Sequence, residues 1–280
     1  MARKKIGIYS DDITNISDHQ LILEFGNDEL VCIAKSAISG EIIAFELFSL
    51  DKGLNDDWND IFYEVKAISQ VFNFSYKKVT CFFNNEEALL IPEKLLTATS
   101  AEDYLSLVYG ESTRHDVKYE KLLATKVFIN AYRVRKAITE LLSRHFIIYQ
   151  TAHTYSTILN DVMRRPIIDP AFIKIQFYSS HFIIAVWKDE RFQLIQSYRY
   201  KSTEDVLYYV MRIVQQYHFD FSEVLLEVSG LIDKELSLYT QLSTLFNRIT
   251  TDNMQLVGVF KTVEGEYPPH YFTPFYKLTL

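Results

Sequence analysis

Alternating apolar positions predict one β-hairpin near the start of the chain and a second hairpin 152 positions later. Residues 21–34 read LILEFGNDELVCIA and residues 173–186 read IKIQFYSSHFIIAV, and the two segments align without a gap. Before the turn, large apolar side chains occupy every second position in both segments, as they do on one face of a β-strand. We interpret the two segments as copies of one structural element.

The segments that follow each hairpin also keep one order. A third strand is predicted at residues 41–50 and again at residues 191–200. Apolar side chains then recur at the spacing of an amphipathic helix. These helical positions are Trp58, Ile61, Phe62, Val65, Ile68 and Phe72 in the first copy, and Val206, Tyr209, Val210, Ile213 and Tyr217 in the second. A buried strand is predicted next, at residues 78–83 and 223–228, so the order βββαβ occurs twice.

Short polar side chains precede both predicted helices. Asn55 or Asp56 is placed to cap the first helix, and Ser202 or Thr203 is placed to cap the second. Such side chains accept hydrogen bonds from the free N–H groups of a first helical turn. Both helices are therefore expected to begin at these positions.

Three antiparallel strands, a right-handed helical crossover and a parallel fourth strand form the ribonuclease-H-like unit, and two such units in tandem form the actin-like ATPase fold. The sequence thus predicts an α/β protein of this fold, with a first unit at residues 1–165 and a second at residues 166–280. An inserted subdomain is expected at about residues 85–145, and the segment FIIY at residues 146–149 is expected to return to the sheet. The aromatic side chains near the end of the chain are expected to pack into the core: Tyr271, Phe272, Phe275 and Tyr276.

Several segments together resemble an uncharacterised bacterial family of unknown function that has an actin-like ATPase fold. They are LIPEKLL followed by DYLSLVYG, the hairpin LILEFGNDELVCIA and the terminal PPHYF. The resemblance extends over essentially the whole chain and implies a fold without implying an activity. More distantly, the layout resembles the actin-like cytoplasmic scaffold proteins of pilus and type II secretion systems, which is a resemblance of topology alone.

The resemblance also indicates where a nucleotide site would lie. Actin-like ATPases bind phosphates with two hairpins, each carrying an Asp-x-Gly motif. In this chain the first hairpin has Glu24 and Gly26 at that spacing, while residues 176–180 of the second hairpin have neither an acidic residue nor a glycine. Gly230 is the nearest match to the glycine turn beside the adenosine. These three residues are candidates for a vestigial nucleotide site, and each is equally compatible with an ordinary turn, so we expect no ATP or magnesium cofactor.

Catalytic carboxylates are also incomplete. A ribonuclease-H-type nuclease needs acidic residues on the first strand, the crossover helix and the fourth strand to hold two metal ions. The first copy offers Glu24 and Glu64 but has Asn84 at the third position, and the second copy offers Gln176 and Glu227. The histidines show no zinc-binding spacing. The sequence therefore predicts no catalytic residues and no metal site.

Charge is distributed unevenly along a chain whose net charge is −7. Residues 114–165 contain 10 basic and 4 acidic side chains. The residues Arg133, Arg135, Lys136 and Arg144 are candidates for a surface that binds an acidic partner or RNA, and a solvated helix face is the alternative.

Two cysteines, Cys32 and Cys81, lie in apolar strands and are expected to be buried and reduced, as in a cytoplasmic protein. No apolar run reaches the length of a signal peptide or a membrane span. The leading hypothesis is a non-catalytic actin-like scaffold or adaptor, a pseudo-ATPase that binds another protein. The alternatives are a nucleotide-binding switch with a degenerate ATP site and an RNA- or ribosome-associated protein that uses the basic residues.

Overall fold

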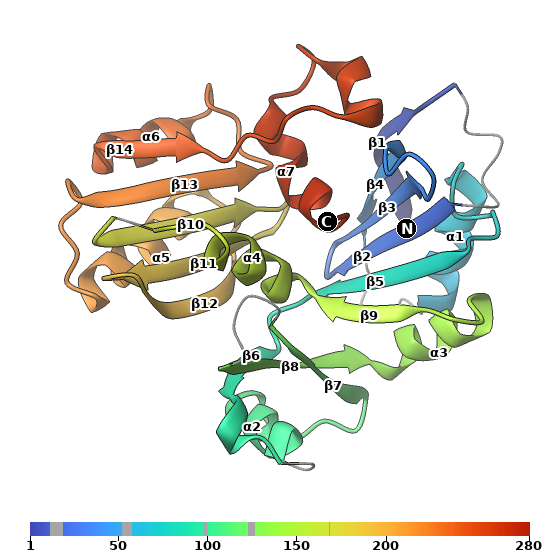
Figure 1. The fold of residues 1–280 in the computed structure, drawn as a ribbon, viewed down its shortest axis with the longest axis horizontal. Coiled ribbons are helices and arrows are strands. Elements are labelled where there is room, and N and C mark those ends of the chain that lie inside the picture. Colours follow the sequence, from blue (N-terminus) through green and yellow to red (C-terminus); the bar gives the residue numbers. More distant parts are fainter. Residues whose placement is uncertain (12–18, 52–57, 98–99, 123–126, 168) are drawn as a thin grey trace. The chain divides into compact units, whose positions relative to one another are not determined.

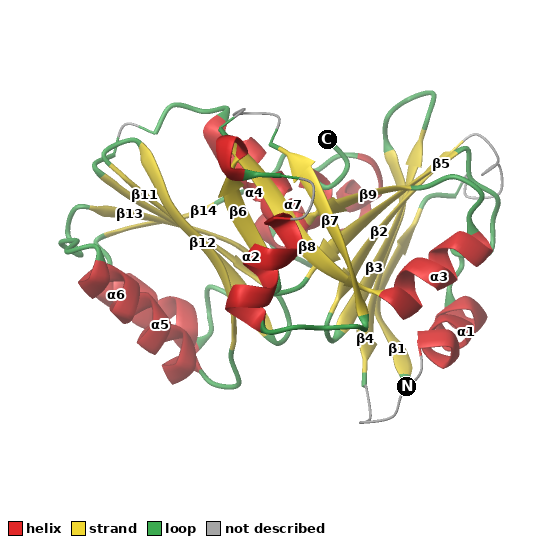
Figure 2. Cartoon of the chain, turned by 90° about the horizontal axis from the view of Figure 1, so that it is seen from below, coloured by secondary structure: helices red, strands yellow, loops and turns green. Residues whose placement is uncertain are grey.

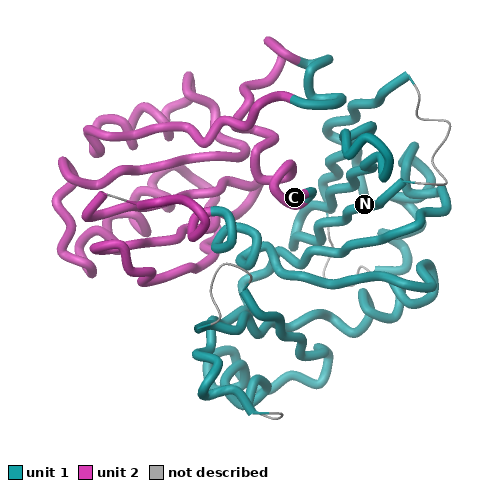
Figure 3. Tube along the Cα trace, viewed as in Figure 1, with its two compact units in different colours: residues 1–161, 257–263, 279 teal, residues 162–256, 264–278, 280 magenta. Residues whose placement is uncertain are grey.

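The chain divides into two compact units, and each contains one main β-sheet (Figure 3). The computed structural model describes residues 1–11, 19–51, 58–97, 100–122, 127–167 and 169–280. Unit 1 comprises Met1–Asp161, Val257–Val263 and Thr279, and unit 2 comprises Val162–Leu256, Glu264–Leu278 and Leu280. The chain therefore returns to unit 1 after it has formed most of unit 2.

The main sheet of unit 1 has six strands in the order β1-β4-β3-β2-β5-β9 (Figure 1). The strands are β1 (Ala2–Tyr9), β2 (His19–Gly26), β3 (Glu29–Ser36), β4 (Ile42–Leu50), β5 (Lys78–Asn84) and β9 (Gln150–His153). β2 pairs with β3 antiparallel and with β5 parallel. The helix α1 (Trp58–Ile68) connects β4 to β5. This unit therefore has the predicted βββαβ order, with β9 added beside β5.

The core of unit 1 uses both faces of this sheet. On one face, Phe25 of β2 stacks on Phe62 of α1 at a ring distance of 6.0 Å. On the other face, Phe45 of β4 meets Phe260 of the 3₁₀ segment η3 (Gly258–Val263) edge to face at 5.4 Å. All four rings are almost completely buried, and each contributes about 2 kcal/mol or more of hydrophobic stabilisation. Cys32 and Cys81 are buried free thiols, as predicted.

The main sheet of unit 2 has five strands in the order β12-β11-β10-β13-β14. The strands are β10 (Ala171–Phe177), β11 (His181–Lys188), β12 (Arg191–Arg199), β13 (Val224–Gly230) and β14 (Arg248–Thr251). The helices α5 (Thr203–Gln216) and α6 (Ser237–Leu245) cover one face of it (Figure 2). The second βββαβ unit and the predicted actin-like fold are thus confirmed.

Local signals in unit 2 also match the predictions. Ser202 caps α5 in a capping box with Asp205, an arrangement that typically stabilises a helix by about 1 kcal/mol. The expected caps of α1, Asn55 and Asp56, lie outside the described residues. The terminal helix α7 (Pro269–Lys277) packs against β13. Of the four aromatic residues expected in the core, Phe272 and Phe275 are buried, whereas Tyr271 and Tyr276 are half-buried.

The insert contains a second, smaller sheet with the order β6-β8-β7. Its elements are β6 (Ala88–Pro92), η2 (Glu93–Leu95), α2 (Ser100–Tyr109), β7 (His115–Lys121) and β8 (Phe128–Arg135). A small apolar cluster that includes Ile91, Leu105 and Ala131 holds α2 on this sheet. The chain then continues through α3 (Lys136–His145) to β9 and α4 (Thr154–Met163).

Two local predictions were wrong. The segment FIIY at residues 146–149 is not a strand, and Ile147 and Ile148 are 102% and 79% exposed. The strand that joins the sheet is β9, which begins at Gln150. The helix α1 ends at Ile68, so Phe72 lies beyond it in the following turn. The strand β7, at residues 115–121, was not predicted, because its sequence is a polar run.

The edge strand β1 was not predicted, because polar groups hold part of it in place. Glu46 of β4 is completely buried and accepts hydrogen bonds from Tyr9 Oη at 2.6 Å and from Gln70 N at 2.8 Å. Lys4 Nζ of β1 lies 2.9 Å from the same carboxylate. These contacts fix β1 to β4 and to the turn after α1, so β1 needs few apolar residues.

No helix in the described part of the chain has both the length and the apolar character that a membrane span requires.

Candidate functional site

The first hairpin carries two buried carboxylates where the fold resemblance places a phosphate site. Glu24 of β2 is 2% exposed and accepts a hydrogen bond from Thr154 Oγ1 at 2.7 Å. Gly26 ends β2, and a Cβ atom there would lie 3.1 Å from Cγ of Glu29, which is itself buried. Glu24 takes the position of the aspartate in the Asp-x-Gly motif, but its carboxyl group is buried and hydrogen-bonded within the protein. The first hairpin thus keeps an acidic side chain at the motif position, and that side chain is engaged by Thr154 at the start of α4.

The amino-terminal end of α4 is also occupied by acidic side chains. Thr154, the first residue of α4, binds Glu24. Glu120 of β7 accepts hydrogen bonds from His153 N at 2.8 Å and Ser156 Oγ at 2.7 Å. A helix amino terminus favours negative charge, and two carboxylates of the protein supply it here. Burial raises the pKa of the Glu120 carboxyl.

The imidazole of His153 is a structural group in this cluster. Its Nδ1 accepts a hydrogen bond from Tyr155 N at 3.1 Å, and its Nε2 lies 3.2 Å from Asn85 O. Nε2 therefore carries the proton of a neutral ring. Burial lowers the pKa of His153 to about 3, so the ring stays neutral at physiological pH and both of its nitrogens are engaged.

This burial predicts a loss of stability in mild acid. The ordinary pKa of histidine is 6.5, and the pKa of His153 in the folded protein is about 3. At pH values between these two, His153 binds a proton only in the unfolded state. The free energy of unfolding should therefore fall by about 2 kcal/mol from this group as the pH decreases from 6.5 to about 5. Urea denaturation at a series of pH values measures the effect.

The control is His153→Gln, whose amide can still donate to Asn85 O but does not titrate. Glu120 has a raised pKa and opposes the trend in both proteins, so the difference between the two pH profiles isolates His153. Parallel profiles would contradict the prediction.

The second hairpin is filled by aromatic side chains. Tyr178 is completely buried, and its ring stacks on His181 with centroids 4.7 Å apart. Phe275 of α7 meets the Tyr178 ring edge to face at 6.0 Å. Gln176 Nε2 donates a hydrogen bond to Tyr178 Oη at 2.5 Å, and Tyr200 Oη donates to Tyr178 O at 2.7 Å. These contacts fix a large ring in the turn where an ATPase of this fold would hold phosphate.

Gly230 serves the backbone of unit 2. It ends β13 with φ 84°, and a Cβ atom at this position would lie 2.1 Å from Phe177 O. Leu231 N donates a hydrogen bond to the same oxygen at 3.0 Å. Only glycine accommodates both the positive φ and this close approach.

The acidic residue expected on the fourth strand of unit 2 belongs to a buried ionic cluster. Glu227 accepts hydrogen bonds from both terminal nitrogens of Arg165, at 2.6 and 2.7 Å, and from Lys174 Nζ at 2.6 Å. Asp252 contacts Lys174 and also Lys277 Nζ, the latter at 2.5 Å. Burial would raise the pKa of Asp252, but Lys174 and Lys277 outweigh it and hold this pKa at about 2. The cluster joins β10, β13 and α7 and leaves Glu227 engaged by cations.

The acidic residues considered for a nuclease do not form a metal site. Glu64 accepts a hydrogen bond from Ala2 N at 2.5 Å, whereas Glu24 binds Thr154. Within the described ranges of the chain, no group of three or more His, Cys, Asp or Glu side chains is arranged to hold a metal ion.

The structure does not bring the four candidate basic residues onto one surface. Arg133 and Arg135 lie in β8 and not on a helix, and Arg133 is 3% exposed. Its guanidinium contacts Glu87 Oε2 at 3.2 Å and Gly110 O at 2.6 Å, so it stabilises the insert. Arg144 is exposed and pairs with Glu140. Arg135 and Lys136 line a depression of about 510 Å³ together with Trp58, Arg114, His115, Ala137 and Glu140.

Solved structures of low sequence identity share the fold. A protein with an actin-like ATPase fold and unknown function from Bacteroides thetaiotaomicron is 15% identical with a TM-score of 0.74, and the match covers 86% of this chain and 93% of that one. The PilM–PilN type IV pilus biogenesis complex gives 11% identity and a TM-score of 0.60, covering 93% of this chain and 97% of that chain. A comparison with curated proteins gives no match.

The sequence of the chain also matches a protein family directly. The match extends over residues 9–249, which is most of the chain. The expected membership of an uncharacterised family is thereby confirmed: this chain belongs to the family described as protein of unknown function (DUF3822).

Proposed function

We propose that this chain is a non-catalytic scaffold or adaptor with an actin-like fold that binds another protein. The observation that carries the proposal is the filled second hairpin. Tyr178 is completely buried between His181 and Phe275, so its ring occupies the turn that would have to accept phosphate. In the first hairpin, Glu24 is buried and hydrogen-bonded to Thr154, which supports the same conclusion.

The choice of a protein partner rests on a structural neighbour. PilM, whose fold this chain shares, was solved in a complex with PilN. An actin-like fold is therefore compatible with a role in binding another protein. Fold alone does not determine function, and the partner of this chain is not identified by that likeness.

The two alternative functions have less support. A nucleotide-binding switch would use Glu24, Gly26 and Gly230, but Glu24 is buried and bound to Thr154, and Gly230 maintains a close backbone contact. An RNA-binding role would use the basic residues of the insert, but Arg133 is buried against Glu87 and Gly110. The scaffold function agrees with all of these contacts.

Calorimetric titration with ATP and magnesium tests the absence of a nucleotide function. We expect no binding heat at millimolar nucleotide and no phosphate release above background. Micromolar binding with turnover would overturn the proposal. If binding without turnover were found, Glu24→Gln would show whether the first hairpin holds the nucleotide, because the substitution removes the carboxylate and keeps the shape of the side chain.

The binding function needs a separate positive test. Affinity purification of the tagged chain from native lysate, followed by mass spectrometry, should identify a protein that co-purifies at a fixed ratio. The purified partner should then form a complex with the chain in the absence of nucleotide. A complex that forms only with ATP would favour the switch instead.

A further inference from the structure

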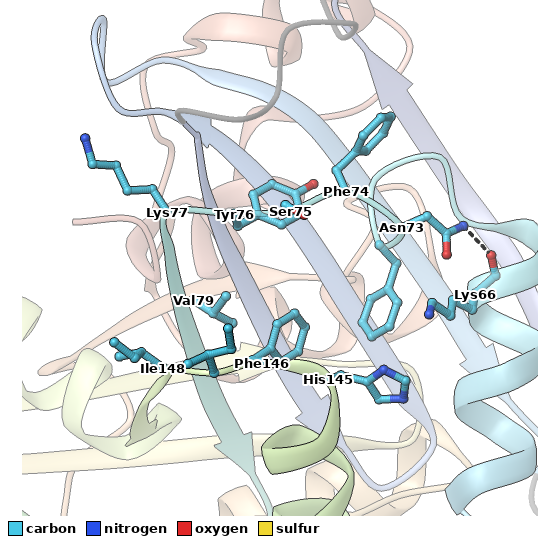
Figure 4. A pocket seen from close by; sticks show the side chains of 12 residues that line it. Lys66, Asn73, Phe74, Ser75, Tyr76, Lys77, Val79, His145, Phe146 and Ile148 are labelled. Atoms are coloured by element: carbon cyan, nitrogen blue, oxygen red, sulfur yellow. Dashed lines mark hydrogen bonds between the residues drawn. The ribbon is translucent and has the colours of Figure 1, made fainter.

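The turn after α1 and the turn before β9 border one depression on unit 1, shown in Figure 4. Its volume is about 450 Å³. One side comes from residues 72–77, which link α1 to β5, and the other side comes from residues 145–148, which link α3 to β9. None of its twelve lining residues serves the hairpins or the ionic cluster described above. The depression is thus a surface feature without an assigned role.

The depression has a mixed lining, in which apolar side chains lie beside polar ones such as Asn73 and Ser75. Phe72 and Val79 are buried beneath it, whereas Phe74 is 41% exposed. The neighbouring Ile147 and Ile148 are 102% and 79% exposed. Single exposed apolar residues are common, but a contiguous group beside a depression is typical of an interaction surface. The bend at residues 147–148 keeps both isoleucines out of the sheet and available to another molecule.

The charges around the depression have one sign. Lys66 and Lys77 lie at its two ends (Figure 4). The imidazole of His145 stacks on Phe62, with ring centroids 5.5 Å apart. Burial, and to a smaller extent the positive charges of Lys66 and Arg144, lower the pKa of His145. This ring is therefore neutral at physiological pH. None of the described residues that line the depression is acidic. On a chain with net charge −7, this depression combines two lysines with apolar and uncharged polar side chains.

We infer that this depression binds a short segment of a partner protein that carries large apolar side chains flanked on both sides by acidic residues. The apolar side chains would contact Phe74, Ile147 and Ile148, and the acidic side chains would pair with Lys66 and Lys77. Charge complementarity at both ends and an apolar centre select this class of ligand over a basic or uniformly polar segment. The inference deepens the proposed adaptor function and rests on it.

A random 16-residue peptide library displayed on phage tests this inference with the full chain as bait. We expect the selected peptides to contain paired large apolar residues flanked by Asp or Glu. Binding should weaken by roughly tenfold or more for the double variant Ile147→Ser/Ile148→Ser and for Lys66→Glu/Lys77→Glu. Fluorescence polarisation with the purified peptides measures the affinities, and added salt should weaken binding.

The matched control is Leu107→Ser, because Leu107 is 83% exposed on α2 and lies in the insert, outside the depression. This control should leave peptide affinity unchanged, and the isoleucine variant and the control should keep their thermal midpoints because Ile147, Ile148 and Leu107 are exposed. Selected peptides that are basic, or that bind the isoleucine variant as tightly as the natural chain, would overturn the inference. A failure to select any binder that the isoleucine variant weakens would also overturn it.

Two other occupants of the depression would be recognised by their own measurements. If the isoleucine variant instead abolished a dimer in analytical ultracentrifugation, the surface would be an interface between two copies of this chain. If it abolished co-sedimentation with phosphatidylserine vesicles, the surface would bind lipid. Either result overturns the peptide inference. If the partner found by affinity purification still bound the isoleucine variant, the adaptor function would stand and only this assignment of the surface would fail.

Discussion

Replacement of Asp252 by asparagine is expected to lower the free energy of unfolding of unit 2 by about 3 to 5 kcal/mol. Lys174 is 1% exposed and contacts Asp252 and Glu227, and Lys277 contacts Asp252 as well. The substitution keeps the size of the side chain but removes one of two carboxylates that balance three cations. The two lysines would then stay buried beside an amide. Urea denaturation followed by circular dichroism measures the loss.

A control with the same substitution is available in the same unit. Asp169→Asn breaks a pair in which Arg248 Nη2 lies 2.6 Å from the Asp169 carboxylate, but this arginine is 47% exposed. Solvent screens such a pair, and the loss should be less than about 1 kcal/mol. A double variant, Lys174→Met with Asp252→Asn, should be more stable than the sum of the single effects predicts, because it removes both the anion and one cation. Equal losses for the two aspartates would show that burial does not control the energy of the cluster.

This cluster illustrates a signal that the sequence contained but did not resolve. Lys174 interrupts an apolar strand that reads IKIQF, and Glu227 interrupts another that reads LLEV. Opposite charges in two buried strands predict that the strands are neighbours, and the structure pairs these two residues directly in the parallel register of β10 and β13. The contributions of Arg165, Lys277 and Asp252 depend on where α4 ends, where α7 ends and where the chain leaves β14, which local patterns do not determine.

The duplicated fold was predictable because each strand and crossover helix buries one face, and burial imposes a period of two or of about 3.6 on the sequence. The predictions were wrong or incomplete where the composition of a segment does not correspond to its burial. The segment at residues 146–149 has the composition of a buried strand but lies at the surface, and β1 has the composition of a surface segment but is fixed by Glu46. Tertiary contacts decided both cases.

The candidate nucleotide site was predictable only in part. The spacing of Glu24 and Gly26 and the bulk of Tyr178 were visible in the sequence. The residues that contact these positions come from distant segments: Thr154 at the start of α4 binds Glu24, and Phe275 of the terminal helix packs against Tyr178. Contacts over such separations are set by the packing of whole elements.

Gly230→Ala is the second substitution with a large expected effect. The added Cβ atom would lie 2.1 Å from Phe177 O, and alanine would have to adopt a φ near 84°. The strand pair β10 and β13 would have to separate near its end, where Leu231 N binds the same oxygen. We expect the free energy of unfolding to fall by about 3 kcal/mol or more, measured by urea denaturation.

Gly265→Ala separates the two causes of this effect. Gly265 lies in the same unit with φ 87°, but no heavy atom lies within 4 Å of a Cβ atom at that position. The free energy of unfolding that Gly265→Ala loses should reflect backbone strain alone, about 1 kcal/mol. The additional free energy that Gly230→Ala loses then measures the close approach to Phe177. Equal losses at the two glycines, together with ATP binding that only Gly230→Ala abolishes, would instead assign Gly230 to a ligand. If Gly230→Ala loses much more stability than Gly265→Ala and nucleotide binding is not affected, Gly230 is assigned to the packing of the sheet, in agreement with the geometry.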